Sequence, residues 1–166
     1  MFLEPEIQRT NLAAVILGMT VLGLGDIEAF PFVDPPDARF IRDGYKLLHE
    51  LGAVDAQQVL TALGRNIARL SVDPRLARMI LAASELHCLT EVLVIVSALE
   101  VVDPRERPLD KAQAADEKHA LFKDEKSDFL VYLKLWNAYR EQARHLTSNK
   151  LRKWCREHFT GQVTHA

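Results

Sequence analysis

Apolar residues recur at helical spacing along most of the chain, and glycines and prolines interrupt this pattern. The first apolar series predicts a helix that ends at Gly23 and Gly25, because glycine readily adopts the left-handed conformation of a helix C-terminus. Three prolines within residues 31–36 exclude a regular helix there. A second helix is predicted between Asp37 and Gly52. The apolar faces of these two helices are Ile7, Leu12, Val15, Ile16, Met19 and Leu22, and Phe40, Leu47, Leu48 and Leu51.

A strand signal follows the second helix. Residues 53–54 and 59–60 are apolar pairs that flank the sequence Asp-Ala-Gln-Gln, which predicts a short β-hairpin. Thr61 can cap a third short helix, because its hydroxyl can accept a hydrogen bond from a main-chain N–H of the first turn. The order helix, helix, hairpin, helix predicts a winged-helix-like domain over residues 1–71.

The second half of the chain is predicted to be an all-helical bundle. Asp73 and Pro74 form a helix start, a capping carboxylate followed by proline at the first helical position. The apolar face of this helix is predicted to be Leu76, Ile80, Ala83 and Leu86. The most apolar stretch, residues 92–99, predicts a helix that is buried on most sides and organises the bundle. A surface helix with a thin apolar stripe that includes Leu109 is expected next.

These elements define a fold that is mainly α with one small hairpin. The helical domain is predicted to span residues 72–159, and residues 160–166 are expected to form a disordered tail. Two further helices are expected within the helical domain, an aromatic one after Ser127 and a final one from about residue 148.

Composition changes this picture little. Lys plus Arg number 21 and Asp plus Glu number 23, and the net charge of -2 argues against a uniformly basic nucleic-acid-binding protein but allows a local basic surface. Cys88 and Cys155 form neither a disulfide scaffold nor a zinc motif, so we expect free thiols in a reducing cytoplasm. No apolar stretch approaches the roughly 20 residues of a spanning helix, so no membrane partner is expected.

Sequence signals for catalysis and metal binding are missing. None of the seven glycines precedes a lysine, which excludes a phosphate-binding loop of the G-x-x-x-x-G-K type. The six histidines lack zinc-ligand spacing, and no Gly-x-Ser-x-Gly nucleophile motif occurs. The tetrad of residues 116–119, Asp-Glu-Lys-His, is interpreted as a solvated helix face. No catalytic, cofactor-binding or metal-binding residue is assigned.

Basic residues near the C-terminus are the candidate functional site. Residues 140–157 carry six basic side chains against two acidic ones, which suits phosphate contacts but is also typical of a solvated surface. A smaller basic group lies near the proline-bounded loop of residues 103–108. The nine candidates are Arg105, Arg107, Lys111, Arg140, Arg144, Lys150, Arg152, Lys153 and Arg156.

An aromatic stripe on the helix after Ser127 has two interpretations. Phe129, Tyr132, Trp136 and Tyr139 could stack on nucleic-acid bases. Their spacing of three and four residues is more typical of a bundle core, and core packing is the preferred interpretation.

Several motifs, in a fixed order, resemble one known family. The segments PEIQRTNL (5–12), FPFVDPP (30–36), LGAV (51–54) with LTALG (60–64), and VDPRLARM (72–79) resemble the region after the second motor domain of DEAH-box RNA helicases. The segments RERP (105–108), AADEKH (114–119), SDFL (127–130) and LRKWC (151–155) narrow the resemblance to bacterial helicases of the HrpA type. The resemblance covers roughly residues 4–159.

The resemblance implies a winged-helix domain followed by a ratchet-like, helicase-associated domain. In this family two RecA-like motor domains bind and hydrolyse ATP with Mg, and the domains that follow wall a channel for single-stranded RNA. The resemblance therefore implies a non-catalytic accessory fragment that couples motor domains of the same polypeptide to single-stranded RNA. ATP and Mg belong to the parent helicase, and the nine basic residues become candidate RNA contacts.

Two other functions stay open at this point. A stand-alone winged-helix module that binds duplex DNA needs a basic recognition helix, but the second helix carries Arg39, Arg42 and Lys46 against Asp37, Asp43 and Glu50. A protein-interaction module with exposed apolar surface is the third possibility.

Overall fold

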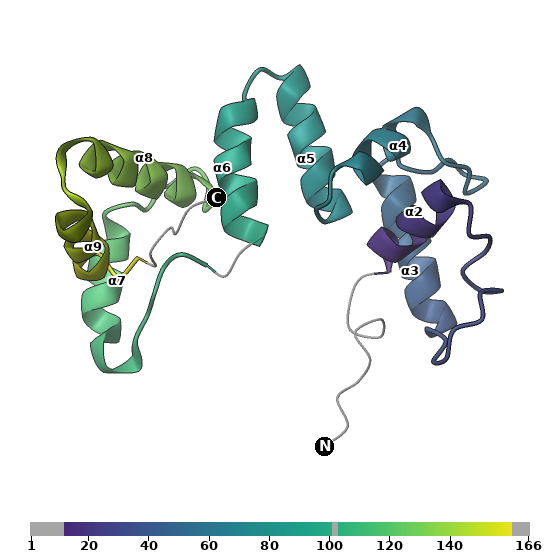
Figure 1. Ribbon diagram of the computed structural model, residues 1–166, viewed down its shortest axis with the longest axis horizontal. Helices are drawn as coiled ribbons and strands as arrows, with labels where there is room; N and C mark the ends of the chain where they lie inside the picture. Colours follow the sequence, from purple (N-terminus) through teal and green to yellow (C-terminus); the bar gives the residue numbers. More distant parts are fainter. Residues whose placement is uncertain (1–11, 101–102, 161–166) are drawn as a thin grey trace. The chain divides into compact units, whose positions relative to one another are not determined.

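The computed structural model describes residues 12–100 and 103–160, which fall into two compact units divided between Glu85 and Leu86 (Figure 1). The first unit holds α2 (Ala13–Leu22), α3 (Ala38–Glu50), α4 (Ala62–Arg69) and α5 (Pro74–Glu85). The second unit holds α6 (Leu89–Glu100), the 3-10 helix η1 (Leu109–Lys111), α7 (Ala112–Ala120), α8 (Leu130–His145) and α9 (Ser148–Glu157). The predicted mainly helical class is confirmed.

The first unit is built around α2. This helix packs against α3 and α4, and α4 packs against α5. Its core includes the fully buried side chains of Leu12, Ile16, Leu48 and Ile67. Gly44 allows α2 and α3 to approach closely, since a Cβ at this position would lie 2.7 Å from Ile16 Cδ1.

The helix boundaries of the first unit follow the local signals in the sequence. Gly23 ends α2 in the left-handed conformation, with φ 66°. Asp37 Oδ1 accepts a hydrogen bond from the Arg39 N–H at 2.7 Å, and Thr61 Oγ1 accepts one from the Gly64 N–H at 2.9 Å. The predicted starts of α3 and α4 are therefore confirmed, as is that of α5 at Pro74.

The predicted hairpin region forms a tight turn with a single antiparallel bridge, between Val54 and Leu60. The Asp55 side chain organises the turn by accepting hydrogen bonds from the main-chain N–H groups of Gln57 at 2.9 Å and Val59 at 2.8 Å. The described part of the chain contains no sheet. The β-hairpin and the winged-helix assignment therefore remain predictions.

Some predicted buried faces are wrong by one helical position. Phe40 is 44% exposed, whereas its neighbour Ile41 is buried. The buried face of α3 runs through Ile41, Gly44 and Leu48 because the close approach at Gly44 turns that side of the helix toward α2. Two other predicted core residues, Leu86 and Leu109, are 74% and 96% exposed.

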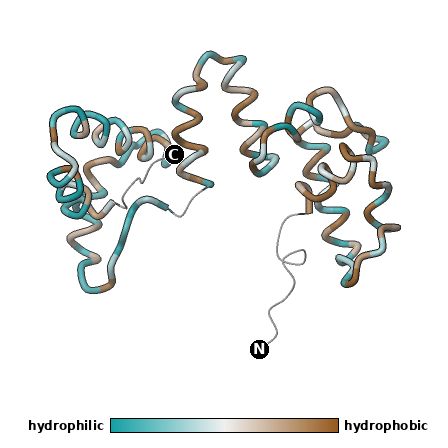
Figure 2. Tube along the Cα trace, in the orientation of Figure 1, coloured by the Kyte–Doolittle hydropathy of each residue, from teal (hydrophilic) through white to brown (hydrophobic). Residues whose placement is uncertain are grey.

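Helix α6 is less buried than its composition predicts. It packs chiefly against α8, and only Ile95 and Val96 are buried along its length. Leu93 and Leu99 remain exposed although the helix is strongly hydrophobic (Figure 2). The prediction of a helix buried on most sides is thus wrong, because within its own unit one helix layer covers it. No helix among the described residues is long and apolar enough to cross a membrane.

The C-terminal end of α9 is tied to the loop that precedes η1. The Phe159 carbonyl oxygen accepts hydrogen bonds from the Glu106 N–H at 2.7 Å and from His119 Nε2 at 3.0 Å. Thr160 forms an antiparallel bridge with Arg105 and is buried. Thr160, the first residue of the predicted tail, therefore belongs to the helical unit, and residues 161–166 lie outside the described residues.

Two ion pairs stabilise the same loop. Arg105 Nε lies 2.9 Å from Asp103 Oδ1, and its guanidinium carbon lies 5.2 Å from the centroid of the Tyr132 ring. The hydrogen bond from Arg105 holds the pKa of the Asp103 carboxyl below its ordinary value, against the effect of partial burial. Arg107 donates two hydrogen bonds of 2.7 Å to the Asp116 carboxylate and likewise lowers the pKa of that carboxyl.

The first unit makes a paired prediction about two glycines. A Cβ at Gly64 would overlap the Ala53 carbonyl oxygen and lie 2.8 Å from Leu60 Cδ1, so Gly64→Ala should lower the free energy of unfolding by about 1–3 kcal/mol. Gly18→Ala is the control, because nothing lies within 4 Å of the added Cβ in α2. This second change should stabilise the protein by roughly 0.5–1 kcal/mol. Urea unfolding of both variants tests the packing, and equal effects would contradict it.

The ion pair between Asp103 and Arg105 predicts how the stability of the protein depends on pH. Because folding lowers the pKa of Asp103, its stabilising effect is present above the unfolded value of about 3.9 and is lost as the pH falls through the folded value. Asp103→Asn should therefore lower stability by up to about 1 kcal/mol at pH 7, as expected for a partly exposed pair, and by progressively less as the pH falls through the folded value. Glu106→Gln removes a neighbouring carboxylate that forms no ion pair among the described residues, so it should lower stability at pH 7 less than Asp103→Asn does. An Asp103→Asn profile parallel to that of the parent protein would contradict the assignment.

Candidate nucleic-acid interface

The nine predicted basic residues all lie in the second unit, but ion pairing divides them into three groups. Arg105 and Arg107 are held by Asp103 and Asp116, as described above. Arg105 is also hydrogen-bonded to the Tyr132 hydroxyl at 3.4 Å. Both guanidinium groups therefore already bind carboxylates, and they stabilise the loop of residues 103–108.

Two other candidates form exposed pairs along their own helices. Arg144 lies 3.4 Å from Glu141 on α8, and Lys153 lies 3.7 Å from Glu157 on α9. Exposed pairs of this kind contribute little stability, so either cation can exchange its carboxylate for a phosphate at small cost.

The remaining five cations are exposed and form no ion pair with any described residue. They are Lys111, Arg140, Lys150, Arg152 and Arg156. Arg152 and Arg156 lie one turn apart on α9, and α9 packs against the helix that carries Arg140. We call the four unpaired cations of α8 and α9 the basic surface: Arg140, Lys150, Arg152 and Arg156.

The local sequence explains why α9 presents these charges to solvent. Cys155 is buried, and Leu151 and Trp154 are half-buried on the side of the helix that packs on the unit. Arg152 and Arg156 share a face of the helix because they lie four residues apart, and each is turned about 100° away from the apolar residue that precedes it. The helix is therefore amphipathic, and its seven polar positions hold four basic residues, one acidic residue, one serine and one asparagine.

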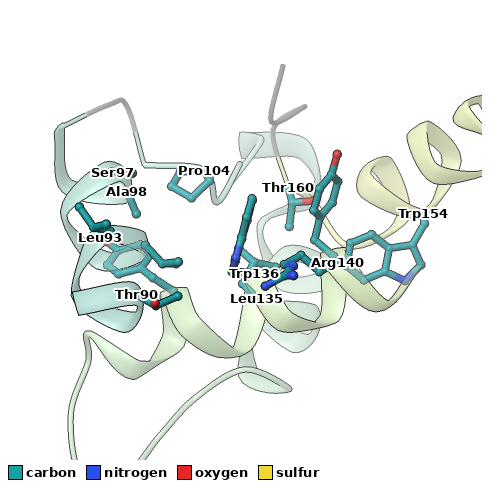
Figure 3. A pocket seen from close by; sticks show the side chains of 13 residues that line it. Thr90, Leu93, Ser97, Ala98, Pro104, Leu135, Trp136, Arg140, Trp154 and Thr160 are labelled. Carbon is teal, nitrogen blue, oxygen red and sulfur yellow. The ribbon is translucent and has the colours of Figure 1, made fainter. Parts of the chain in front are cut away.

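An apolar pocket of about 430 Å³ lies beside Arg140 (Figure 3). Helix α6 supplies Leu93, Val94 and Ala98 to its walls, and the bulk of the opposite wall comes from α8. The full lining is Thr90, Leu93, Val94, Ser97, Ala98, Pro104, Tyr132, Leu135, Trp136, Tyr139, Arg140, Trp154 and Thr160.

The aromatic residues of α8 contribute to this pocket more than to the core. Val131 and Leu135 are the buried residues of the helix, whereas Phe129 is 48% exposed. Tyr132, Trp136 and Tyr139 are half-buried and line the pocket. The preferred interpretation of the stripe as a bundle core is thus wrong for most of its members. The spacing of Val131 and Leu135 was the signal for the true buried face.

The described residues contain no candidate metal centre. No cluster of three or more His, Cys, Asp or Glu side chains there could hold a metal ion, and Cys88 and Cys155 are free thiols. The tetrad at residues 116–119 has structural roles instead: Asp116 binds Arg107, and His119 bonds the Phe159 carbonyl. His119 is half-buried, so the tetrad is not wholly a solvated face.

Comparison with known proteins identifies the family. Residues 73–162 match the helicase associated domain (HA2), ratchet-like. The chain is 56% identical over 165 residues to the ATP-dependent RNA helicase HrpA homolog of Haemophilus influenzae, and 56% identical over 160 residues to ATP-dependent RNA helicase HrpA of Escherichia coli. It is 35% identical over 155 residues to the pre-mRNA-splicing factor ATP-dependent RNA helicase prp22 of Schizosaccharomyces pombe.

These matches cover nearly all of this chain but a small part of each relative. They include 95%, 93% and 93% of the chain, and 13%, 12% and 13% of the respective relatives. The HA2 match already includes α5 of the first unit, and the likeness to these helicases extends over the rest of that unit. The predicted resemblance to HrpA-type DEAH-box helicases is confirmed, and the chain belongs to the helicase-associated, ratchet-like (HA2) family.

Proposed function

We propose that this chain is a non-catalytic part of an ATP-dependent RNA helicase and that it contacts single-stranded RNA through the basic surface. The observation that supports this most directly is the identity of 56% to two HrpA helicases over nearly the whole chain. The four cations of the basic surface, which form no ion pair with any described residue, supply the physical means. In the parent protein, RecA-like motor domains of the same polypeptide bind ATP and Mg.

Phosphate binding suits these side chains better than base reading does. Lys and Arg contact phosphates by charge and by charge-assisted hydrogen bonds, which carry no sequence information. A helicase must track along any sequence, so contacts to the backbone are the appropriate kind. Arg140, Lys150, Arg152 and Arg156 have no ion pair to break among the described residues before they meet a phosphate.

Coupling to a motor requires that the basic surface move as one piece. Leu146 and Thr147 alone separate α8 from α9, and the far end of α9 is bonded to the loop before η1. Both ends of α9 are therefore held. We propose that a displacement of this unit by the motor domains carries the RNA contacts with it. We also propose a winged-helix-like domain over residues 1–71, a ratchet-like domain over residues 72–159, and a cytoplasmic location.

A protein-interaction role is the second candidate, because several large apolar side chains are exposed. Leu121 and Leu86 are 66% and 74% exposed. Sedimentation of the purified chain, with and without RNA, distinguishes this role from RNA binding. Concentration-dependent self-association without RNA binding would favour the protein-interaction role. A duplex-DNA regulator is disfavoured, since the α3 cations are balanced by acids and Lys46 lies 3.9 Å from Glu50.

The RNA proposal predicts a charge-reversal effect. Lys150→Glu with Arg152→Glu should weaken single-stranded RNA binding by at least about tenfold at low salt. If each lysine or arginine meets one phosphate, the salt slope should fall by about 1.4, because each lost contact on a single strand contributes about 0.7. Fluorescence anisotropy with a labelled oligonucleotide at several salt concentrations measures both quantities.

A matched control separates position from net charge. Lys123→Glu with Lys126→Glu makes the same change in net charge at two exposed residues of the loop before α8. It should leave the affinity within about twofold of the parent chain. Equal losses in both double variants would show that the α8–α9 cations have no special role.

The same proposal predicts that the purified chain does not hydrolyse ATP. The sequence contains no G-x-x-x-x-G-K loop to hold the phosphates. Phosphate release in the presence of ATP, Mg and single-stranded RNA should stay at the level of the buffer blank. Turnover that follows the protein through purification would overturn the non-catalytic assignment.

A further inference from the structure

We infer that the apolar pocket between α6 and α8 receives one unstacked base of the RNA whose phosphates contact the basic surface. This inference rests on the proposed RNA-binding function and extends it from the phosphates to the bases. Its basis is the meeting of aromatic rings, an arginine and a cavity of suitable size in one place (Figure 3).

The walls of the pocket match the faces of a nucleobase. Trp136 and Tyr139 are stacked on each other, with ring centroids 5.9 Å apart and planes inclined by 22°. Leu93, Val94 and Ala98 of α6 also line it. A base has two flat, weakly polar faces, and such faces bind well to aromatic and aliphatic surfaces. The volume of about 430 Å³ admits a base with room to spare.

The surface of the lining is mostly apolar, and its polar atoms come from scattered side chains. Arg140, Thr90, Ser97 and Thr160 lie among the apolar residues, and the aromatic residues add two tyrosine hydroxyls and two indole N–H groups. A lining with so little polar surface cannot distinguish the four bases strongly, because discrimination requires several well-placed donors and acceptors. The pocket is therefore expected to accept any base, as a protein that moves along RNA requires.

Arg140 connects the pocket with the basic surface. It lines the cavity, it is exposed, and it forms no ion pair among the described residues. Trp154, on the half-buried side of the helix that carries Arg152 and Arg156, lines the same cavity. A ligand that fills the pocket with a flat, apolar group and carries negative charge beside it satisfies both features. Single-stranded nucleic acid has this combination.

A second copy of this chain fits the pocket less well. In a two-fold symmetric dimer through this face, each copy brings its own Arg140, Arg152 and Arg156 close to the same cations of the other copy. Facing surfaces with charges of the same sign repel one another. An electrically neutral apolar peptide would fill the cavity but would leave the neighbouring cations without partners.

The decisive experiment compares RNA with and without a base. The full 166-residue chain is titrated against a short single-stranded oligonucleotide and against the same oligonucleotide with abasic positions. We expect Trp136→Ala to weaken binding of the intact oligonucleotide by about tenfold, with an unchanged salt slope, because stacking involves no counterion release. The abasic oligonucleotide should bind the parent chain and the variant equally weakly.

Two further variants guard against a trivial loss of structure. Trp136→Phe keeps an aromatic ring and should retain most of the affinity. Phe129→Ala removes an exposed ring of the same region that does not line the pocket, and it should have no effect. Circular dichroism and thermal unfolding show whether each variant is folded.

A direct spectroscopic readout is available because the chain has only two tryptophans. Trp154→Phe leaves Trp136 as the single indole. Its fluorescence should be quenched by the intact oligonucleotide and much less by the abasic one, since quenching requires contact with a base.

The possible outcomes distinguish the binding of a base in the pocket from the phosphate contacts of the basic surface. Salt-sensitive binding that is indifferent to abasic positions and to Trp136→Ala overturns the base pocket and leaves the phosphate contacts. The absence of RNA binding by the parent chain overturns both. A dimer that dissociates on Trp136→Ala identifies a protein occupant and overturns the base pocket as well.

Discussion

The arrangement of the second unit depends on one carbonyl group. Phe159 has φ 50°, and its carbonyl oxygen accepts hydrogen bonds from both Glu106 and His119. Thr160 continues this contact by bridging Arg105 and donating to the Cys155 carbonyl. These bonds add to the packing of α9 on α8 and to the burial of Cys155 in holding Trp154 and Thr160 at the pocket. The loop, α7 and α9 therefore meet at this carbonyl group, and α9 carries three residues of the basic surface.

Local chemistry made the helix boundaries predictable from the sequence. Capping by Asp37, Thr61 and Asp73 requires only residues two or three positions away, and the structure contains each of these hydrogen bonds. Buried faces depend on distant partners, and here prediction was less successful. The apolar spacing favours Phe40 over Ile41, because nothing local reveals that Gly44 lies close to Ile16. Likewise, the sequence of α8 offers two possible buried faces, one with Val131 and Leu135 and one with the aromatic stripe. Only the packing of α6 on α8 shows that Val131 and Leu135 are the buried residues.

The sequence locates the basic residues of the candidate site, but it does not show which of them are held in ion pairs. Arg107 is paired with Asp116, nine residues later, and Arg105 contacts Tyr132, 27 residues later. Such pairings depend on the course of the loop and cannot be read from spacing. The sequence identified all four residues of the basic surface, but it gave no indication that Arg140 also lines a cavity. The pocket itself arises from α6 and α8, whose contacts connect residues about 40 positions apart.

The incomplete burial of α6 explains how a small helical unit can hold both a stable core and an open apolar wall. Its core consists of Ile95, Val96, Ala115, Val131, Leu135 and Cys155. A second layer of helices over α6 would bury its remaining apolar side chains and add stability, since burial of apolar area is the main stabilising contribution in folding. It would also close the pocket. Instead, ion pairs and main-chain hydrogen bonds around residues 103–107 stabilise the unit, and Leu93 stays exposed and Trp136 half-buried at the pocket. An open apolar wall beside cations that have no ion pair within residues 12–100 and 103–160 is the combination that a polyanion with flat apolar bases can satisfy.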